Sequence, residues 1–218
     1  MGGAVPRVLL AFGDSNTHGT PPMAARGIPA RHPRAARWPE VAAARLGPGW
    51  QVLSEGLPGR TTVHDDPVEG AHRNGLTVLP ALLESHQPVD VVAILLGTND
   101  LKARFGLPSV DIALGVERLA RLVLGSTAGP DGRAPAVLLI APVPIAEAGC
   151  LAGIFAGGAA KSRALAGHCA EVAARLEVPF LDAGRVAATD PLDGVHLDPA
   201  AQVALGEAIA AAVAEHWG

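Results

Sequence analysis

Four short segments of this sequence contain the residue types that acyl transfer requires. They include a serine (Ser15), glycines that allow close approach (Gly59 among them), an amide side chain (Asn99), and an aspartate and a histidine three residues apart (Asp193 and His196). Acyl transfer needs a hydroxyl nucleophile, a base that removes its proton, a carboxylate that orients the base, and donors for the oxyanion. The set of residues therefore predicts nucleophilic catalysis by a serine that a histidine activates.

The segments follow apolar runs whose pattern predicts strands at 8–12, 51–54, 89–96, 136–141 and 179–181. Helical spacing predicts helices at 38–46, 76–86, 111–124, 162–176 and 198–217, the last capped by Asp198 with Pro199 at its first position. This alternation predicts the α/β class, a three-layer α/β/α sandwich with a five-stranded parallel, flavodoxin-like sheet. No repeat or linker divides the sequence, so we expect a single domain over residues 1–218. Ligands of such folds bind outside the carboxyl ends of the strands, where the four segments should meet.

Composition excludes several classes of protein. The 218 residues have a net charge of −4 with scattered arginines, which argues against a nucleic-acid partner. Hydrophobic residues make up 49% and charged residues 17%, so the chain can form a core, but no apolar run is long enough to cross a membrane. The two cysteines cannot make a disulfide framework, and the first residues lack the pattern of a secretory signal. We therefore expect a cytoplasmic protein.

The four segments resemble the SGNH hydrolases, also called GDSL esterases, whose marker residues lie in four separate blocks. The matching residues are Gly13-Asp14-Ser15, Gly59, Gly97-x-Asn99-Asp100 and Asp193-x-x-His196. Similarity to the arylesterase/acyltransferase branch of that family extends over Arg37-Trp38, EGLPGRTT-x-x-DDP, LGTND-x-K and VPFLDAG. No G-x-S-x-G is present, which argues against the nucleophile elbow of α/β-hydrolases.

The resemblance implies a role for each matching residue. Ser15 would be the nucleophile, His196 the general base and Asp193 the carboxylate that orients it. The backbone N–H groups of Ser15 and Gly59 and the side-chain amide of Asn99 would form the oxyanion hole. The residue types suit these roles, because Gly59 has no Cβ to keep a substrate away and the Asn99 amide donates without adding a charge.

The implied activity is hydrolysis of short-chain acyl esters of aryl and alkyl alcohols through an acyl-enzyme, with transfer of the acyl group to alcohols. Its partners would be small-molecule esters and alcohols, and no cofactor is expected. A carbohydrate O-deacetylase of the same family is the alternative. A non-catalytic or nucleotide-binding flavodoxin-like module is a rival from another class, although it has no need of the Asp-x-x-His segment.

Several neighbouring residues have a structural interpretation beside the chemical one. We expect Asp14 and Asp100 to hold loops by accepting hydrogen bonds from backbone N–H groups. His18 fits either the pocket wall or a solvated loop. Phe155 fits the core or the pocket wall, whereas core or interface packing is expected of Trp38.

Two patterns suggest other sites only weakly. His64, Asp65 and Asp66 could be metal ligands, as could Asp193 and His196 with Asp198, but Asp198 is better explained as a helix cap. The segment 157–162 resembles a phosphate-binding loop, yet no glycine precedes its lysine. We therefore expect no metal and no nucleotide.

The resemblance also implies assembly, because members of the branch are oligomers with restricted, apolar pocket entrances. The segment 142–161 contains apolar residues that we expect to be exposed and covered by a neighbouring subunit, namely Ile145, Leu151, Ile154 and Phe155. A homo-oligomer with a narrowed entrance would favour an alcohol over water as the acyl acceptor.

Overall fold

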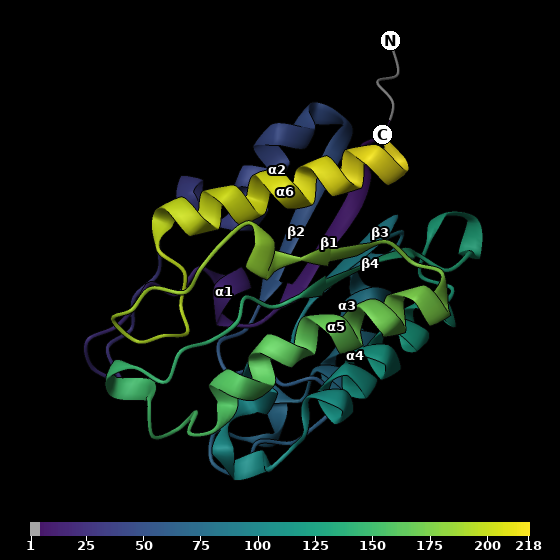
Figure 1. Ribbon diagram of the computed structural model, residues 1–218. Helices are drawn as coiled ribbons and strands as arrows, with labels where there is room; N and C mark the ends of the chain where they lie inside the picture. Colours follow the sequence, from purple (N-terminus) through teal and green to yellow (C-terminus); the bar gives the residue numbers. More distant parts are fainter. Residues whose placement is uncertain (1–4) are drawn as a thin grey trace.

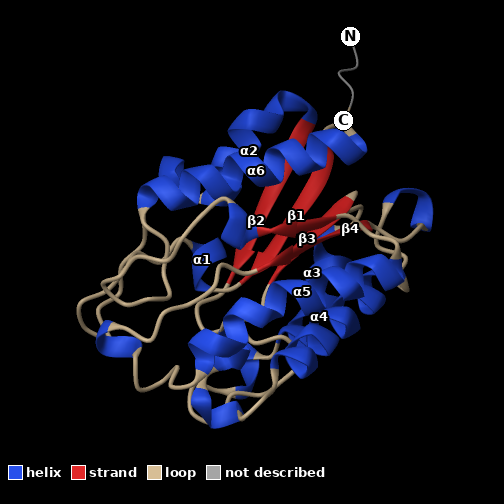
Figure 2. Cartoon of the chain, viewed as in Figure 1, coloured by secondary structure: helices blue, strands red, loops and turns tan. Residues whose placement is uncertain are grey.

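The computed structural model describes residues 5–218, so the first four residues, on which the expectation about a secretory signal partly depends, lie outside it. One parallel sheet, in the order β2-β1-β3-β4-β5, forms the centre of the molecule (Figure 2). Its strands are β1 (Arg7–Gly13), β2 (Trp50–Gly56), β3 (Val91–Leu95), β4 (Ala136–Ala141) and β5 (Phe180–Asp182). This order is the flavodoxin-like one, so the predicted α/β fold is confirmed.

Helices cover both faces of the sheet (Figure 1). Leu9 and Ala11 of β1 pack into the apolar core beneath α2 and α6, whereas Leu10 and Phe12 belong to the core on the opposite face, beneath α3, α4 and α5. The helices are α2 (Trp38–Leu46), α3 (Gly75–His86), α4 (Ser109–Leu124), α5 (Gly158–Leu176) and α6 (Pro199–Trp217). Because both faces are covered, the strands β3 and β4 are apolar along their whole length.

Most of the predicted elements are present, with differences at their ends. The bounds of α2 and β4 agree with the prediction, and the Asp198 side chain accepts a hydrogen bond from the Ala201 N–H as the predicted cap of α6. Helix α5 begins four residues earlier than predicted, because Gly157 adopts the left-handed conformation that lets the chain enter the helix at Gly158. A single helical turn that the pattern did not predict, α1 (Ser15–His18), follows β1 directly.

The expectation that segment 142–161 exposes apolar side chains is wrong. Ile145, Leu151 and Phe155 are only 4%, 8% and 3% exposed, and Ile154 is partly buried. The segment folds back over the core beneath α4 and α5, so these side chains pack inside the chain itself. Trp38 is fully buried, as expected, and both cysteines are free. None of the helices within residues 5–218 is long and apolar enough to span a membrane.

Candidate active site

Ser15 lies on the turn that follows the central strand β1. The turn is so tight that a side chain at Gly13 would collide with Thr17, which explains the glycine at this position. Asp14 caps α1 by accepting a hydrogen bond from the Asn16 N–H at 3.0 Å, which places Ser15 at the first position of the helical turn. A backbone N–H at that position has no acceptor within its helix, so the Ser15 N–H can bind an external anion.

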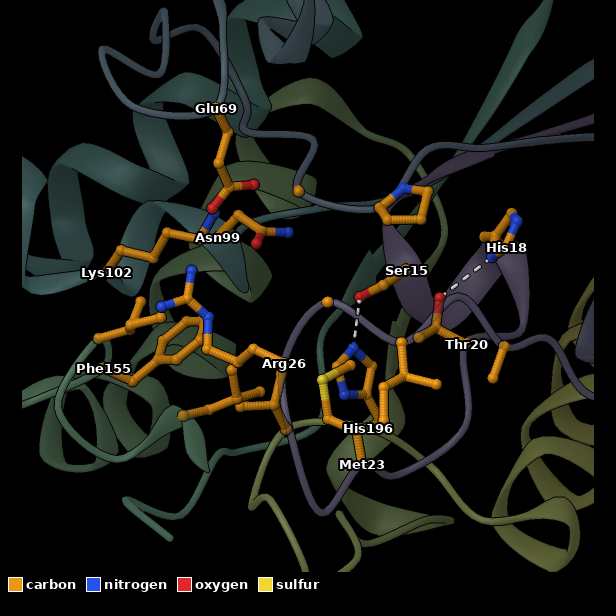
Figure 3. A pocket seen from close by; sticks show the side chains of 18 of the residues that line it. Ser15, His18, Thr20, Met23, Arg26, Glu69, Asn99, Lys102, Phe155 and His196 are labelled. Carbon is orange, nitrogen blue, oxygen red and sulfur yellow. Dashed lines mark hydrogen bonds and ion pairs between the residues drawn. The ribbon is translucent and has the colours of Figure 1, made fainter. Parts of the chain in front are cut away.

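His196 and Asp193 meet Ser15 from the loop that precedes α6. The His196 Nε2 atom lies 3.1 Å from the Ser15 Oγ atom, and its Nδ1 atom lies 2.7 Å from Asp193 Oδ2. All three residues are at least 95% buried, and Figure 3 shows Ser15 and His196 facing one another across the cavity wall. The structure thus brings together the three residues that the sequence places in the first and last blocks.

The Asp193 carboxylate is held in its ionised form by hydrogen bonds. Burial alone would raise its pKa, but bonds from the His196 side chain and from the backbone N–H groups of Val195 and His196 lower it to about 2. The Met23 N–H donates a further hydrogen bond to Oδ2 at 2.9 Å. A carboxylate in this state can fix the orientation of the imidazole and stabilise its protonated form.

Asn16 joins the two loops, although sequence reasoning gave it no role. Its side-chain amide donates to the Val195 carbonyl at 3.2 Å and accepts from the Leu197 N–H at 3.1 Å. Its own carbonyl accepts from the Gln202 side chain in α6 at 2.8 Å. Asn16, the neighbour of Ser15, is therefore bonded to the residues on either side of His196, which holds Ser15 and His196 together.

Gly59 occupies a turn between β2 and α3 that borders the same cavity. The Arg60 N–H donates to the Leu57 carbonyl at 3.0 Å, and Gly59 has a φ of 80°. With Pro58 at its second position, this is a type II turn, in which the third residue needs positive φ and is usually glycine. The Pro-Gly pair is a local signal that sequence reasoning could have used to predict the turn.

Asn99 follows β3, next to β1 in the sheet. Its Nδ2 atom donates one hydrogen bond to the Arg60 carbonyl at 3.1 Å, which orients the amide beside the Gly59 turn. The next residue, Asp100, is fully buried and accepts hydrogen bonds from the backbone N–H and the hydroxyl of Thr62. Asp14 and Asp100 therefore both hold loops through backbone N–H groups, as expected.

Ser15, Gly59, Asn99 and His196 border a cavity of about 610 Å³. One part of its wall is apolar and is formed by Met23, Ile28, Leu151, Ile154 and Phe155. Another part is polar, and Figure 3 shows Asn99, Lys102 and Glu69 close together there, with Arg26 nearby. The cavity can therefore accept an ester with an apolar portion while keeping polar groups within reach.

His18 lines the cavity rather than a solvated loop. Burial, followed by the nearby charges of Arg31 and Arg37, lowers the pKa of His18 to about 4. Its Nδ1 atom lies 3.0 Å from the Thr20 hydroxyl (Figure 3). His18 is therefore a neutral hydrogen-bonding group at neutral pH.

A cluster of four charged side chains forms the back of the polar wall, and sequence reasoning missed it. Asp66 accepts from Lys102 at 3.3 Å and from Arg104 at 3.0 Å. Glu69 Oε1 accepts from the same two cations at 2.6 and 3.2 Å. Two carboxylates and two cations neutralise one another here.

The contacts of Asp65 and Asp66 argue against the hypothesis that these residues bind a metal ion together with His64. The side chains of Lys102 and Arg104 already pair with the two oxygens of Asp66. Asp65 accepts a hydrogen bond from the Asn74 amide at 2.8 Å. Across residues 5–218, no three His, Cys, Asp or Glu side chains are grouped so that they could hold a metal ion.

The arrangement can move a proton and stabilise a negative oxygen. A Ser15 hydroxyl in contact with His196 Nε2 can lose its proton as it attacks an electrophile, and Asp193 stabilises the resulting imidazolium. The Ser15 N–H, the Gly59 N–H and the Asn99 amide border the same cavity and could donate to an oxyanion.

Comparisons with known proteins find one family model and several similar solved structures. The model of the GDSL-like Lipase/Acylhydrolase family matches residues 11–204. Est24, a carbohydrate acetylesterase from Sinorhizobium meliloti, is 41% identical, with 97% of this chain and 100% of that one covered and a TM-score of 0.93. The native aryl esterase of M. smegmatis is 40% identical, with 96% and 99% covered and a TM-score of 0.91, and its inhibitor-bound form has a TM-score of 0.92. No curated protein sequence matches the chain.

Proposed function

This chain belongs to the GDSL-like lipase/acylhydrolase family, and from that premise we propose that it is a serine esterase acting on short-chain acyl esters of aryl and alkyl alcohols. The observation that carries the proposal is the continuous contact from Ser15 Oγ through His196 to Asp193, with distances of 3.1 and 2.7 Å, at the wall of a cavity. This arrangement of a serine, a histidine and an aspartate serves nucleophilic catalysis, and a binding module has no use for it.

In the first half of the reaction Ser15 Oγ attacks the carbonyl carbon of the ester while His196 Nε2 takes the hydroxyl proton. The carbonyl oxygen becomes negative and is bound by the Ser15 N–H, the Gly59 N–H and the Asn99 amide. The bond to the alcohol oxygen then breaks, and His196 returns its proton to that oxygen. An alcohol leaves, and the acyl group stays bonded to Ser15.

In the second half an acceptor attacks the acyl-enzyme. His196 takes a proton from the acceptor, the bond between the acyl carbon and Ser15 Oγ breaks, and Ser15 recovers its proton. Water as acceptor releases a carboxylic acid, whereas an alcohol releases a new ester. We propose that alcohols compete with water because the apolar wall formed by Met23, Ile28 and Phe155 favours them in attack geometry.

Release of p-nitrophenol from p-nitrophenyl acetate tests the proposal. Ser15→Ala and His196→Ala should each lower kcat by about 10⁴–10⁶, and the double variant should lose little more because the residues act as a unit. The matched control is Ser85→Ala, at an exposed serine of α3 outside the cavity, which should keep full activity. Substantial turnover by a purified Ser15→Ala protein would overturn the assignment.

Hydrolysis of acetylated carbohydrates is the second candidate. The polar wall with Glu69, Lys102 and Arg26 favours it, because these groups can bind the hydroxyls of a sugar. A panel of acetate esters with aryl, alkyl and sugar leaving groups separates the two. A kcat/KM that is higher for sugar acetates than for aryl acetates would select the carbohydrate esterase.

A further inference from the structure

We propose that Arg73 is a positioning residue for the oxyanion hole, which holds and polarises the peptide group that contains the Gly59 N–H. The inference rests on the proposed esterase function. It adds a residue outside the four marker blocks, contributed by the one-turn 3-10 helix Ala71–Arg73 that precedes α3.

The turn at Gly59 leaves one peptide group free. Its closing hydrogen bond uses the Leu57 carbonyl and the Arg60 N–H, so neither the Pro58 carbonyl nor the Gly59 N–H takes part in the turn. These two groups belong to the same planar trans peptide and point in opposite directions. Arg73 Nη1 donates a hydrogen bond to the Pro58 carbonyl. The guanidinium thereby fixes the plane of the peptide and the direction of its N–H.

The bond also changes the strength of the donor. A hydrogen bond from a charged donor to a peptide carbonyl draws electron density from the peptide, which makes its N–H a better donor. The effect is largest when an oxyanion forms, because the N–H then carries a charge-assisted hydrogen bond. Arg73 would therefore stabilise the transition state more than the bound substrate.

Arg73 is not held in an ion pair within the part of the chain that the structure describes. Glu69 lies close to Gly59 on the same side, but Lys102 and Arg104 already neutralise it together with Asp66. Within residues 5–218, no carboxylate forms an ion pair with Arg73, and its buried Nε atom has no hydrogen-bond partner. A Cβ built on Gly59 would meet Glu69 Oε2 first and would lie 3.3 Å from this Nε atom, so the guanidinium and a carboxylate both lie beside the turn.

Backbone hydrogen bonds keep Arg73 in register with the turn. The Thr61 N–H donates to the Arg73 carbonyl at 3.0 Å, and the Arg73 N–H donates to the Gly70 carbonyl at 3.1 Å. Thr61 also pairs with Asn74 in an isolated parallel bridge. The backbone of Arg73 is thus bonded to Thr61, two residues after Gly59, which keeps the guanidinium near the peptide that it holds.

The other two donors are held in a comparable way, but by uncharged groups. The carbonyl of the Asp14–Ser15 peptide accepts from the His18 N–H at 2.9 Å, and the Asn99 amide uses its second N–H on the Arg60 carbonyl. Only the Gly59 peptide is held by a side chain, so only there can a substitution remove the holding group and leave the donor in place.

Three substitutions separate the charge of Arg73 from its hydrogen bond. Arg73→Met removes both and should lower kcat for p-nitrophenyl acetate by about 10- to 100-fold, less than the loss of an oxyanion donor itself. KM should change less than about threefold. Arg73→Gln keeps a donor without charge and should lose less, and Arg73→Lys should recover most of the rate. Arg133→Met, at an exposed arginine outside the cavity, is the matched control.

A trifluoromethyl ketone inhibitor, which forms a negative tetrahedral adduct with a serine, gives a second readout. Its Ki should rise in the Arg73 variants by the same factor by which kcat/KM falls, while thermal unfolding shows that the variants are folded. If Arg73→Met proves unstable, the Gln and Lys variants carry the test.

Three outcomes would overturn the inference. The first is a raised KM with unchanged kcat, which makes Arg73 a ground-state binding residue. The second is a Ki for the ketone that does not change, and the third is a Lys variant as impaired as the Met variant. Full activity of Ser15→Ala would instead overturn the proposed function, and the two failures are therefore distinguishable.

Discussion

Asn99 contributes to the proposed oxyanion hole through a side chain, so its donor can be removed without disturbing the backbone. Asn99→Ala should lower kcat for aryl acetates by about 10²–10³, with a much smaller effect on KM, because the bond forms mainly in the transition state. The measurement is a comparison of kcat and KM with those of the unmodified enzyme. A variant that changes only KM would make Asn99 a residue for ground-state binding.

Asp14 should make the stability of the protein depend on pH. Burial raises the pKa of Asp14 from 3.8 to about 6, although hydrogen bonding from Asn16 and the charges of His196 and Arg60 oppose the rise. The folded state therefore holds this proton more tightly than the unfolded state, and the free energy of unfolding falls as pH rises between those values. The shift corresponds to a loss on the order of 2–3 kcal/mol.

Urea unfolding of the unmodified protein and of Asp14→Asn between pH 4 and pH 7 measures this effect. The stability of Asp14→Asn relative to the unmodified protein should increase with pH. Asp193, whose pKa is lowered to about 2, stabilises the fold above its ordinary value of 3.8 and loses that effect only below the range tested. Asp100 is buried and its pKa is also raised, but it is present in both proteins and cancels. A difference that does not vary with pH would contradict the prediction.

The helices and strands were predictable where local signals mark their ends. Pro39 and Gly47 bound α2, and the apolar run of β4 is long enough for a strand covered on both faces. The start of α5 was not predictable, because Gly157 and Gly158 are typical of a loop, and only the left-handed conformation of Gly157 makes them a helix start.

The site residues also differ in how far the sequence could predict them. Ser15, Gly59, Asn99, Asp193 and His196 lie in short motifs, whereas the partners of Asp66 and Glu69 lie more than thirty residues away. Ion pairs between distant residues leave no periodic pattern, so the charged cluster could not be predicted. The role that we propose for Arg73 depends on a backbone carbonyl and had no signal in the sequence for the same reason.

The cap of α6 tests how much a predicted local signal stabilises the fold. The Asp198 carboxylate accepts the Ala201 N–H at 2.7 Å, directly after the loop that holds His196. Asp198→Ala should lower the free energy of unfolding by about 1 kcal/mol. Glu215→Ala, at an exposed position in the same helix, should change it by less than about 0.5 kcal/mol. Equal effects of the two substitutions in urea unfolding would show that the cap contributes nothing.

For the molecule as a whole, we make one proposal about its domains and one about its assembly. Two apolar cores on opposite faces of one sheet favour a single domain over residues 1–218. We also propose a homo-oligomer, although not through segment 142–161. Ile28 and Val68 are 67% and 73% exposed on loops beside the cavity, and Leu192 next to Asp193 is 47% exposed. A neighbouring subunit that covers these side chains would narrow the cavity entrance.

Light scattering should therefore detect an oligomer, which with vinyl acetate and benzyl alcohol in buffer forms benzyl acetate faster than the concentrations of alcohol and water predict. Val68→Lys, which leaves the cavity lining unchanged, should weaken assembly and lower the share of ester formed. Val5→Lys, at an exposed valine just before β1, should do neither. A monomer, or a product ratio that follows the concentrations, would leave an ordinary hydrolase.

The contact between Ser15 and His196 joins residues 181 positions apart, and Asn16 adds three more bonds of nearly the same span. Contacts between such distant residues close long loops, whose closure costs chain entropy, so we expect them to form late when this protein folds. A partly folded molecule, even with most of its sheet in place, has a serine that no histidine activates. Esterase activity during refolding therefore reports the completion of folding, and the nucleophile stays unreactive while the chain is still exposed to other molecules.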